Sequence, residues 1–235
     1  MLNYIFLQVA NPVADSAEAL AQNSTSDGIV THFFDLAVKG GWLMIPIVAL
    51  SFVAVFIFFD RYFVIKRAGK IDDTLLERVK SYILQGKIET ALTLARNQDT
   101  PAARMIEKGI SRIGRPIADV NSAIEQVGNL EISKLEKGLP VLASVAGGAP
   151  MLGFLGTVTG MVQAFYDMAN AGNNINITLL SAGIYEAMIT TVAGLIVGIT
   201  AYFAYNILVT NVQKVVFKME MATSEFLDLL NEPAK

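Results

Sequence analysis

The chain has 235 residues, of which 53% are hydrophobic and 17% are charged, and its net charge is −3. Soluble domains usually carry about a quarter of their residues as charged side chains, so this composition and the mean hydropathy of +0.49 indicate a membrane protein. The chain has no cysteine and a single histidine, His32, which excludes disulfide frameworks, thiol nucleophiles, zinc–thiolate sites and most histidine-based chemistry.

The N-terminal segment, residues 1–35, begins with the apolar stretch LNYIFLQVA. No basic residue precedes that stretch, and the first basic residue of the chain is Lys39. A signal peptide needs a basic region before its apolar core. We therefore expect residues 1–35 to remain as an extracytoplasmic arm with a short interfacial helix, and NSTSDG to form a flexible break.

Three apolar segments are long enough to cross a bilayer of roughly 30 Å, which takes about 20 helical residues. The predicted spans are residues 36–65, which contain WLMIPIVALSFVAVFIFF, and residues 138–166 and 178–210. Backbone groups in lipid must find their hydrogen-bond partners within the protein, which favours helices. The predicted fold class is an all-α integral membrane protein with three transmembrane helices.

The loop between the first two predicted spans, residues 66–137, has helical periodicity. Apolar residues recur every three or four positions after Asp72 and Asp73, either of which can cap the start of a helix. A second helix begins near Ile117 and runs towards the second span with only Gly138 and Pro140 interrupting, so the two parts are expected to form one long helix. Eleven acidic residues balance the basic ones from Asp60 to Glu136, and no RNA-reading motif is present, so we expect no nucleic-acid binding. The loop is either a docking domain or a set of solvated, self-packing helices, and the second reading is the commoner one.

Basic residues indicate how the spans are oriented. Of the 18 Lys and Arg residues, one precedes Trp42, fourteen lie from Arg61 to Lys137, none lies between the second and third spans, and three follow the third. Basic residues favour the cytoplasmic side. We therefore expect an outer N-terminus, a cytoplasmic helical loop, a periplasmic loop at residues 167–177 and a cytoplasmic tail at residues 211–235.

Small residues are concentrated in the second and third spans. The second span contains Pro150 and a run of glycines, and the third contains GLIVG, which places Gly194 and Gly198 at GxxxG spacing. The glycines of the second span are Gly147, Gly148, Gly153, Gly156 and Gly160. Because small residues let membrane helices approach closely, these spans are expected to pack tightly within or between subunits.

Polar residues lie at matching depths in the same two spans. If the outer boundaries are near Tyr166 and Thr178, Thr157 lies about 14 Å deep and Glu186 about 12 Å deep. Thr190 follows Glu186 by four residues, on the same helix face. Together with Thr191 and Thr200, these residues form a predicted polar track whose hydroxyls can hold water and exchange protons.

Glu186 is the only charged residue between Asp167 and Lys214. An ionised carboxylate facing hydrocarbon costs about 3 kcal/mol at a helix centre on insertion scales. The cost falls if the group faces a pore, finds a partner or becomes neutral, which makes the residue a candidate proton carrier. The alternative is a structural role, in which Glu186 reaches the outer interface or bonds a neighbouring hydroxyl.

Two sequence motifs, APMLGFLGTVTGM (149–161) and GIYEAMITTVAGLIVGITAYFAYN (183–206), resemble the MotA/TolQ/ExbB proton-channel family, most closely its ExbB and TolQ branch. By motif, the resemblance assigns Glu186 as the third-span acid, Thr157 and Thr191 as the paired threonines, and Asn206 as the asparagine near the end of the third span. It implies a homopentamer in the bacterial inner membrane, around the helices of a single-span partner like ExbD or TolR. It also implies proton flow that drives a protein like TonB or TolA, with no cofactor and no metal.

One departure from the family is Thr200, because relatives of ExbB often have proline there, so helix bending and the polar track can differ. Three other functions stay open. They are a TolQ-like role in envelope maintenance, a sodium-driven motor that uses Thr190 and Thr191, and a passive scaffold. An intramembrane protease needs Ser–His, paired Asp or HExxH chemistry in its spans, and these spans have one acid and no histidine. We therefore expect no enzymatic activity.

Overall fold

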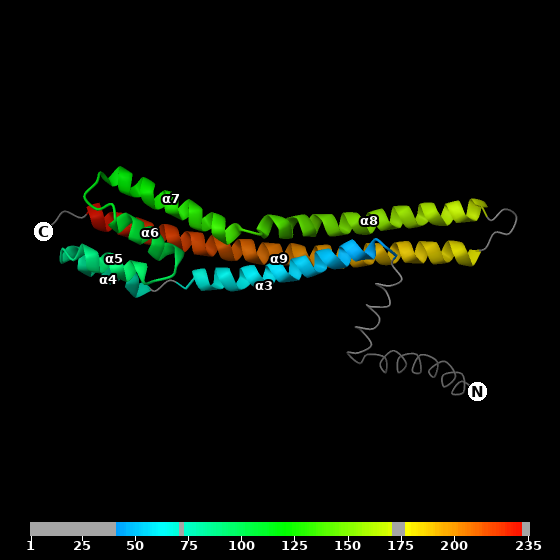
Figure 1. The fold of residues 1–235 in the computed structure, drawn as a ribbon, viewed down its shortest axis with the longest axis horizontal. Coiled ribbons are helices and arrows are strands. Elements are labelled where there is room, and N and C mark those ends of the chain that lie inside the picture. Colours follow the sequence, from blue (N-terminus) through cyan, green and yellow to red (C-terminus); the bar gives the residue numbers. More distant parts are fainter. Residues whose placement is uncertain (1–40, 71–72, 171–176, 232–235) are drawn as a thin grey trace, which may run out of the picture. The chain divides into compact units, whose positions relative to one another are not determined.

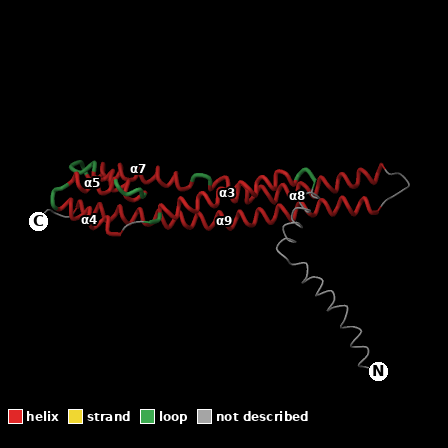
Figure 2. Tube along the Cα trace, turned by 60° about the horizontal axis from the view of Figure 1, so that its bottom comes forward, coloured by secondary structure: helices red, strands yellow, loops and turns green. Residues whose placement is uncertain are grey.

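The computed structural model of the chain describes residues 41–70, 73–170 and 177–231 (Figure 1). Over these residues the structure consists of helices and turns, without a strand (Figure 2). The predicted N-terminal arm and most of the predicted 167–177 loop lie outside the described residues. The helices are α3 (Met44–Ala68), α4 (Asp73–Leu84), α5 (Ile88–Arg96), α6 (Pro101–Ile110), α7 (Ile117–Glu136), α8 (Leu139–Asn170) and α9 (Ile177–Asn231).

Three helical stretches are long and apolar enough to cross a membrane, namely Met44–Ala68, Ile117–Asn170 and Leu180–Asn231. The predicted all-α class with three spans is thereby confirmed, and the chain is a multi-pass membrane protein. Helix α9 is the longest element, with 55 residues, and it continues without a break from the predicted third span through residues 211–231.

The helix that begins at Ile117 leads into the second span, as predicted, but it is interrupted at residues 137 and 138. Helix α7 ends at Glu136, Lys137 has an extended ψ of 125°, and α8 begins at Leu139. Gly138, between the two helices, has a φ of 88°, in the left-handed region that glycine adopts most easily. A glycine that looked like a tolerated interruption in the sequence therefore separates two helices.

The remaining loop residues form three helices instead of one periodic segment. Gly86, with a φ of 74°, separates α4 from α5. Helix α6 was not predicted, although its start has a recognisable signal. The hydroxyl of Thr100 accepts a hydrogen bond from the backbone N–H of Ala103, and Pro101 occupies the first helical position.

The described residues form two compact units. The first unit contains residues 41–48 and 150–195, and the second contains residues 49–149 and 196–231 apart from the gap at 71–72. Helices α3, α8 and α9 each contribute residues to both units. Pro150, inside α8, is the first residue of that helix that belongs to the first unit.

The second unit has a conventional side-chain core. Helix α4 packs on α5, and α6 packs on both α5 and α7. Phe226 of α9 is fully buried in this core. A methyl group at Gly109 of α6 would collide with the Phe226 ring and lie 2.8 Å from Ile124 of α7, so the glycine lets three helices meet.

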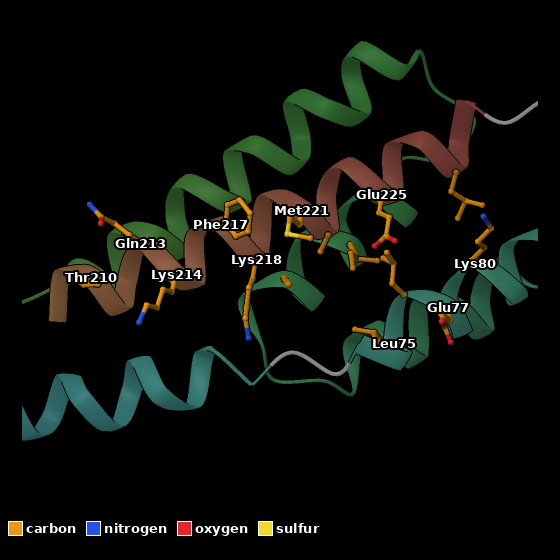
Figure 3. A pocket seen from close by; sticks show the side chains of 15 residues that line it. Leu75, Glu77, Lys80, Thr210, Gln213, Lys214, Phe217, Lys218, Met221 and Glu225 are labelled. Carbon is orange, nitrogen blue, oxygen red and sulfur yellow. The ribbon is translucent and has the colours of Figure 1, made fainter. Parts of the chain in front are cut away.

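A cavity of about 810 Å³ lies in the second unit between α4, α6 and α9 (Figure 3). Its apolar lining includes Leu75, Ile106, Phe217 and Met221, and its charged lining residues are Glu77, Lys80, Lys214, Lys218 and Glu225. The Lys218 ammonium group donates to the carbonyl oxygen of Gly69 at 3.2 Å. This bond fastens the end of α3 to α9 beside the cavity.

Candidate functional site

Helices α8 and α9 approach closely in the first unit because glycines face the neighbouring backbone. A methyl group at Gly153 would lie 2.8 Å from the Thr190 carbonyl oxygen and 3.0 Å from the Thr191 Cα atom. At Gly160 it would lie 2.8 Å from the Ala187 Cβ atom. Real Cβ atoms do not approach other atoms so closely, so a larger residue at either position would separate the helices. We call this contact the α8–α9 seam.

The seam also contains small residues that sequence reasoning missed. A methyl group at Gly183 would lie 2.7 Å from the Ala164 Cβ atom. Gly160 and Ala164, like Gly183 and Ala187, have the spacing of four that allows close packing, and this spacing was the available signal. Around Gly147 and Gly148, by contrast, an added methyl group meets nothing within 4 Å in the described chain. The glycines of the second span therefore do not all serve the same contact.

Three threonine hydroxyls of the seam converge on two backbone carbonyls. The Thr190 side chain is buried, 2% exposed, and its hydroxyl donates to the Ala187 carbonyl at 2.7 Å. The Thr191 hydroxyl lies 2.9 Å from the Gly153 carbonyl, and the Thr157 hydroxyl lies 3.2 Å from the Ala187 carbonyl. The hydroxyls of Thr157 and Thr191 also form a short hydrogen bond with each other. We call these three residues the hydroxyl cluster.

The bonds of Thr157 and Thr191 permit two arrangements of their protons, because a hydroxyl donates only one proton and its hydrogen can rotate. In the first arrangement, Thr191 donates to the Gly153 carbonyl and Thr157 donates to Thr191. In the second, Thr191 donates to Thr157, and Thr157 donates to the Ala187 carbonyl. The pair can therefore reverse the direction of its hydrogen bonds without any movement of the helices.

Glu186 lies directly beside this cluster in the sequence but does not join it. The Thr157 hydroxyl reaches the Ala187 carbonyl and the Thr191 hydroxyl. Because Gly160 faces Ala187, Thr157 lies about one turn of α9 beyond the level of Glu186. The Glu186 side chain is exposed, and among the described residues it has no hydrogen bond or ion pair. The bond to a neighbouring hydroxyl, which the alternative structural role requires, is therefore not formed among the described residues.

Two other predicted site residues, Thr200 and Asn206, form hydrogen bonds within their own helix. Thr200 and Asn206 belong to the second unit and donate to the carbonyls of Ile196 and Tyr202, each four residues earlier in α9. A proline in place of Thr200 has no backbone N–H for the bond to Ile196, so the threonine preserves the regular helix there. Thr200 consequently does not extend the cluster.

The site has the chemistry of a proton or small-cation pathway. Its hydroxyls and carbonyls can bind water or a small cation, and Glu186 is the titratable group nearest to them in the sequence. In the described part of the chain, no group of three His, Cys, Asp or Glu residues could hold a metal ion.

Comparison with known proteins identifies relatives with such a function. Residues 97–221, more than half of the chain, match the model of the MotA/TolQ/ExbB proton channel family. The matched region includes the seam, the hydroxyl cluster and Glu186.

Three curated relatives illustrate the similarity. A putative ExbB-like biopolymer transport protein of Synechocystis is 27% identical over 76% of this chain and 71% of its own length. The Tol-Pal system protein TolQ of Pseudomonas aeruginosa is 29% identical over 70% of this chain and 75% of its own length. The biopolymer transport protein ExbB of Xanthomonas campestris is 38% identical over 37% of this chain and 34% of its own length. The family match covers most of the two long membrane helices and the site between them, and the chain therefore belongs to the MotA/TolQ/ExbB proton channel family.

Proposed function

We propose that this chain is the proton-conducting subunit of an inner-membrane motor of the ExbB type, which energises TonB-dependent transport across the outer membrane. The observation that carries the proposal is the exposed Glu186 carboxylate, unpaired within the described chain, beside the hydroxyl cluster. A carboxylate in an apolar span needs water, a partner or a proton, and all three are available in a subunit that conducts protons.

The proposed assembly is a homopentamer around a single-span partner like ExbD or TolR. The distribution of basic residues supports an outer N-terminus and a cytoplasmic C-terminus. Protons enter from the outer side, bind Glu186 and pass the hydroxyl cluster towards the cytoplasm. One charge moved through 100 mV supplies about 2.3 kcal/mol, enough for a modest movement of the partner against a protein like TonB or TolA.

The substitution Glu186→Gln tests this function, because it preserves shape and removes the titratable group. We expect the variant complex to assemble and to lose energised uptake through the outer membrane by at least about a hundredfold, the size of a lost proton-transfer group. Uptake is measured in cells that lack the native chain and contain its partner proteins. The matched control is Glu220→Gln, the same change at an exposed position of α9, which should leave uptake unchanged. Normal uptake by the Glu186 variant would refute the proposal.

A TolQ-like role is the second candidate, and the similarity to TolQ of Pseudomonas aeruginosa favours it. The two roles predict different defects in cells that lack the chain. An ExbB-like role predicts loss of energised nutrient uptake with an intact envelope, whereas a TolQ-like role predicts detergent sensitivity with normal uptake.

Two further alternatives are a motor driven by sodium in place of protons and a passive scaffold that conducts no ion. The oxygens of the hydroxyl cluster can also ligate sodium, and we prefer the proton because the matching family is one of proton channels. Replacing sodium by potassium in the medium should leave function intact, and a loss would favour a sodium motor. A passive scaffold predicts that Glu186→Ala functions normally.

A further inference from the structure

One side of the Glu186 carboxylate faces the backbone of a glycine. A methyl group at Gly41 would collide with the Glu186 carboxylate oxygen Oε1, so the backbone just before α3 lies against this group. Gly41 has a φ of 66°, a conformation that also favours glycine. The next residue is Trp42, which is 74% exposed, and tryptophan is enriched where a helix leaves the membrane. Glu186 is therefore close to the end of the first span that is expected to face outward.

A row of residues on α8 lies on the same side of the seam as Glu186. Gly156, Gly160, Gln163 and Asp167 are spaced by four, three and four residues, so they follow one another along one side of the helix. Gly156 packs directly on the Thr190 side chain, and Thr190 is one turn after Glu186 on α9.

The same contacts fix the level of this row. Gly160 faces Ala187, the residue after Glu186. Gln163 and Asp167 therefore extend from the level of Glu186 towards the outer end of α8, and the rise from Gly160 to Asp167 is about 10 Å.

The polar side chains of this row are linked to each other. The Gln163 amide donates to the Asp167 carboxylate at 2.9 Å, and both side chains are exposed. An amide and a carboxylate exposed to lipid are costly, so this side of α8 is expected to face water or protein. Val162, on another side of the same turn, is 63% exposed and can face lipid without cost.

We infer that Gly41, Gln163 and Asp167 form the wall of a water-filled vestibule that leads from the outer end of α8 to Glu186. This inference rests on the proposed function and names the route by which its protons reach the carboxylate. The Asp167 carboxylate attracts cations at the opening, and the Gln163 amide orders water between that opening and Glu186. Gly41 leaves the space that the Glu186 side chain needs.

Cysteine accessibility tests the vestibule directly, because the chain has no cysteine of its own. The variants are Gln163→Cys, Asp167→Cys and, as the control at the same depth, Val162→Cys. Each full-length variant is assembled with its partners in right-side-out vesicles and exposed to a membrane-impermeant, cationic methanethiosulfonate reagent. A thiol in water ionises and reacts, whereas a thiol in lipid stays protonated, so we expect Gln163→Cys and Asp167→Cys to react at least about tenfold faster than Val162→Cys.

Three results would overturn the vestibule. Slow reaction at Gln163→Cys, equal to that of Val162→Cys, would mean that this side of α8 is sealed by lipid or protein. Fast reaction at all three positions would mean that the whole outer end of α8 lies in water. Faster reaction in inside-out than in right-side-out vesicles would also overturn it, since the route would then open to the cytoplasm.

The labelling reaction does not depend on ion flow. Each cysteine variant is therefore also labelled in a chain that carries Glu186→Gln as a second substitution. Selective labelling together with normal uptake by the Glu186 variant would support the vestibule and refute the proposed function. Loss of uptake without selective labelling would support the function and refute the vestibule.

Discussion

Two acidic residues, one in each unit, have opposite surroundings. Glu131 in the second unit is 4% exposed and pairs with Lys134 at 2.7 Å and with Arg104 at 3.4 Å. Glu186 in the first unit is exposed and has no such partner in the described chain. The comparison separates an acid that holds helices together from an acid that is available for chemistry, since burying a charge without a partner is unfavourable.

The units also differ in how their helices make contact. In the second unit, side chains such as Phe226 fill the space between helices. In the first unit, glycines bring backbone against backbone, and threonine hydroxyls bond the carbonyls of Gly153 and Ala187 between the helices. Close packing of this kind leaves little space for water inside the seam, so an ion path must run through the hydroxyls or along the side of the seam.

Glu131→Gln should cause the largest loss of stability. Removing the negative charge leaves Arg104 and Lys134 together without their anion, and hydrogen bonds to charged groups are worth about 1.5–3 kcal/mol. We expect a lower unfolding midpoint of the purified complex by circular dichroism, with normal uptake per assembled complex. The Glu186→Gln variant should show the reverse pattern. Equal stability of both variants would contradict the structural role of Glu131.

Gly156→Ala should weaken the seam. The added methyl group would overlap the Thr190 hydroxyl, and overpacking of this kind typically costs about 1–3 kcal/mol. Gly147→Ala is the matched control, because an added methyl group there meets nothing within 4 Å. The measurement is the unfolding midpoint of each variant, and similar midpoints for the two would exclude a tight contact at Gly156.

Gly138→Ala should cost less, because its difficulty is the left-handed backbone rather than space. An alanine in that conformation costs about 1–2 kcal/mol, whereas asparagine tolerates it better. Gly138→Asn should therefore be milder than Gly138→Ala, and Gly156→Asn should be worse than Gly156→Ala. The unfolding midpoints of the four variants show whether each glycine is needed for its backbone conformation or for close packing. If alanine and asparagine ranked in the same order at both positions, this distinction would be contradicted.

The sequence was sufficient for the three spans, because long apolar runs are visible without coordinates, and it singled out the lone acid Glu186 as a site candidate. It also identified Thr157, Thr190 and Thr191 as candidates. It did not show that Gly138 interrupts the helix, because a glycine in a helical pattern is ambiguous without its backbone angles.

The sequence also placed Glu186 and Thr190 on one helix face, and in the structure only Thr190 is buried. That difference depends on α8, because Gly156 of α8 packs on the Thr190 side chain and not on the Glu186 side chain. Contacts between helices of this kind are set by tertiary packing, which the periodicity of one helix does not report.

The smallest predicted effect concerns the pair Thr157 and Thr191. Side-chain hydrogen bonds between membrane helices average about 0.6 kcal/mol, and these two hydroxyls share a bond. A double-mutant cycle with Thr157→Val and Thr191→Val should therefore show that the double variant loses less stability than the sum of the two single variants, by about that amount. Thr159→Val is the control, because its hydroxyl bonds the Leu155 carbonyl of its own helix at 2.9 Å. Each single variant of the pair should also lower uptake, since it removes the shared bond and with it both hydrogen-bond directions, while the Thr159 variant should not. Strict additivity with normal uptake would mean that the two hydroxyls only fasten the helices, and that protons leave Glu186 by another route.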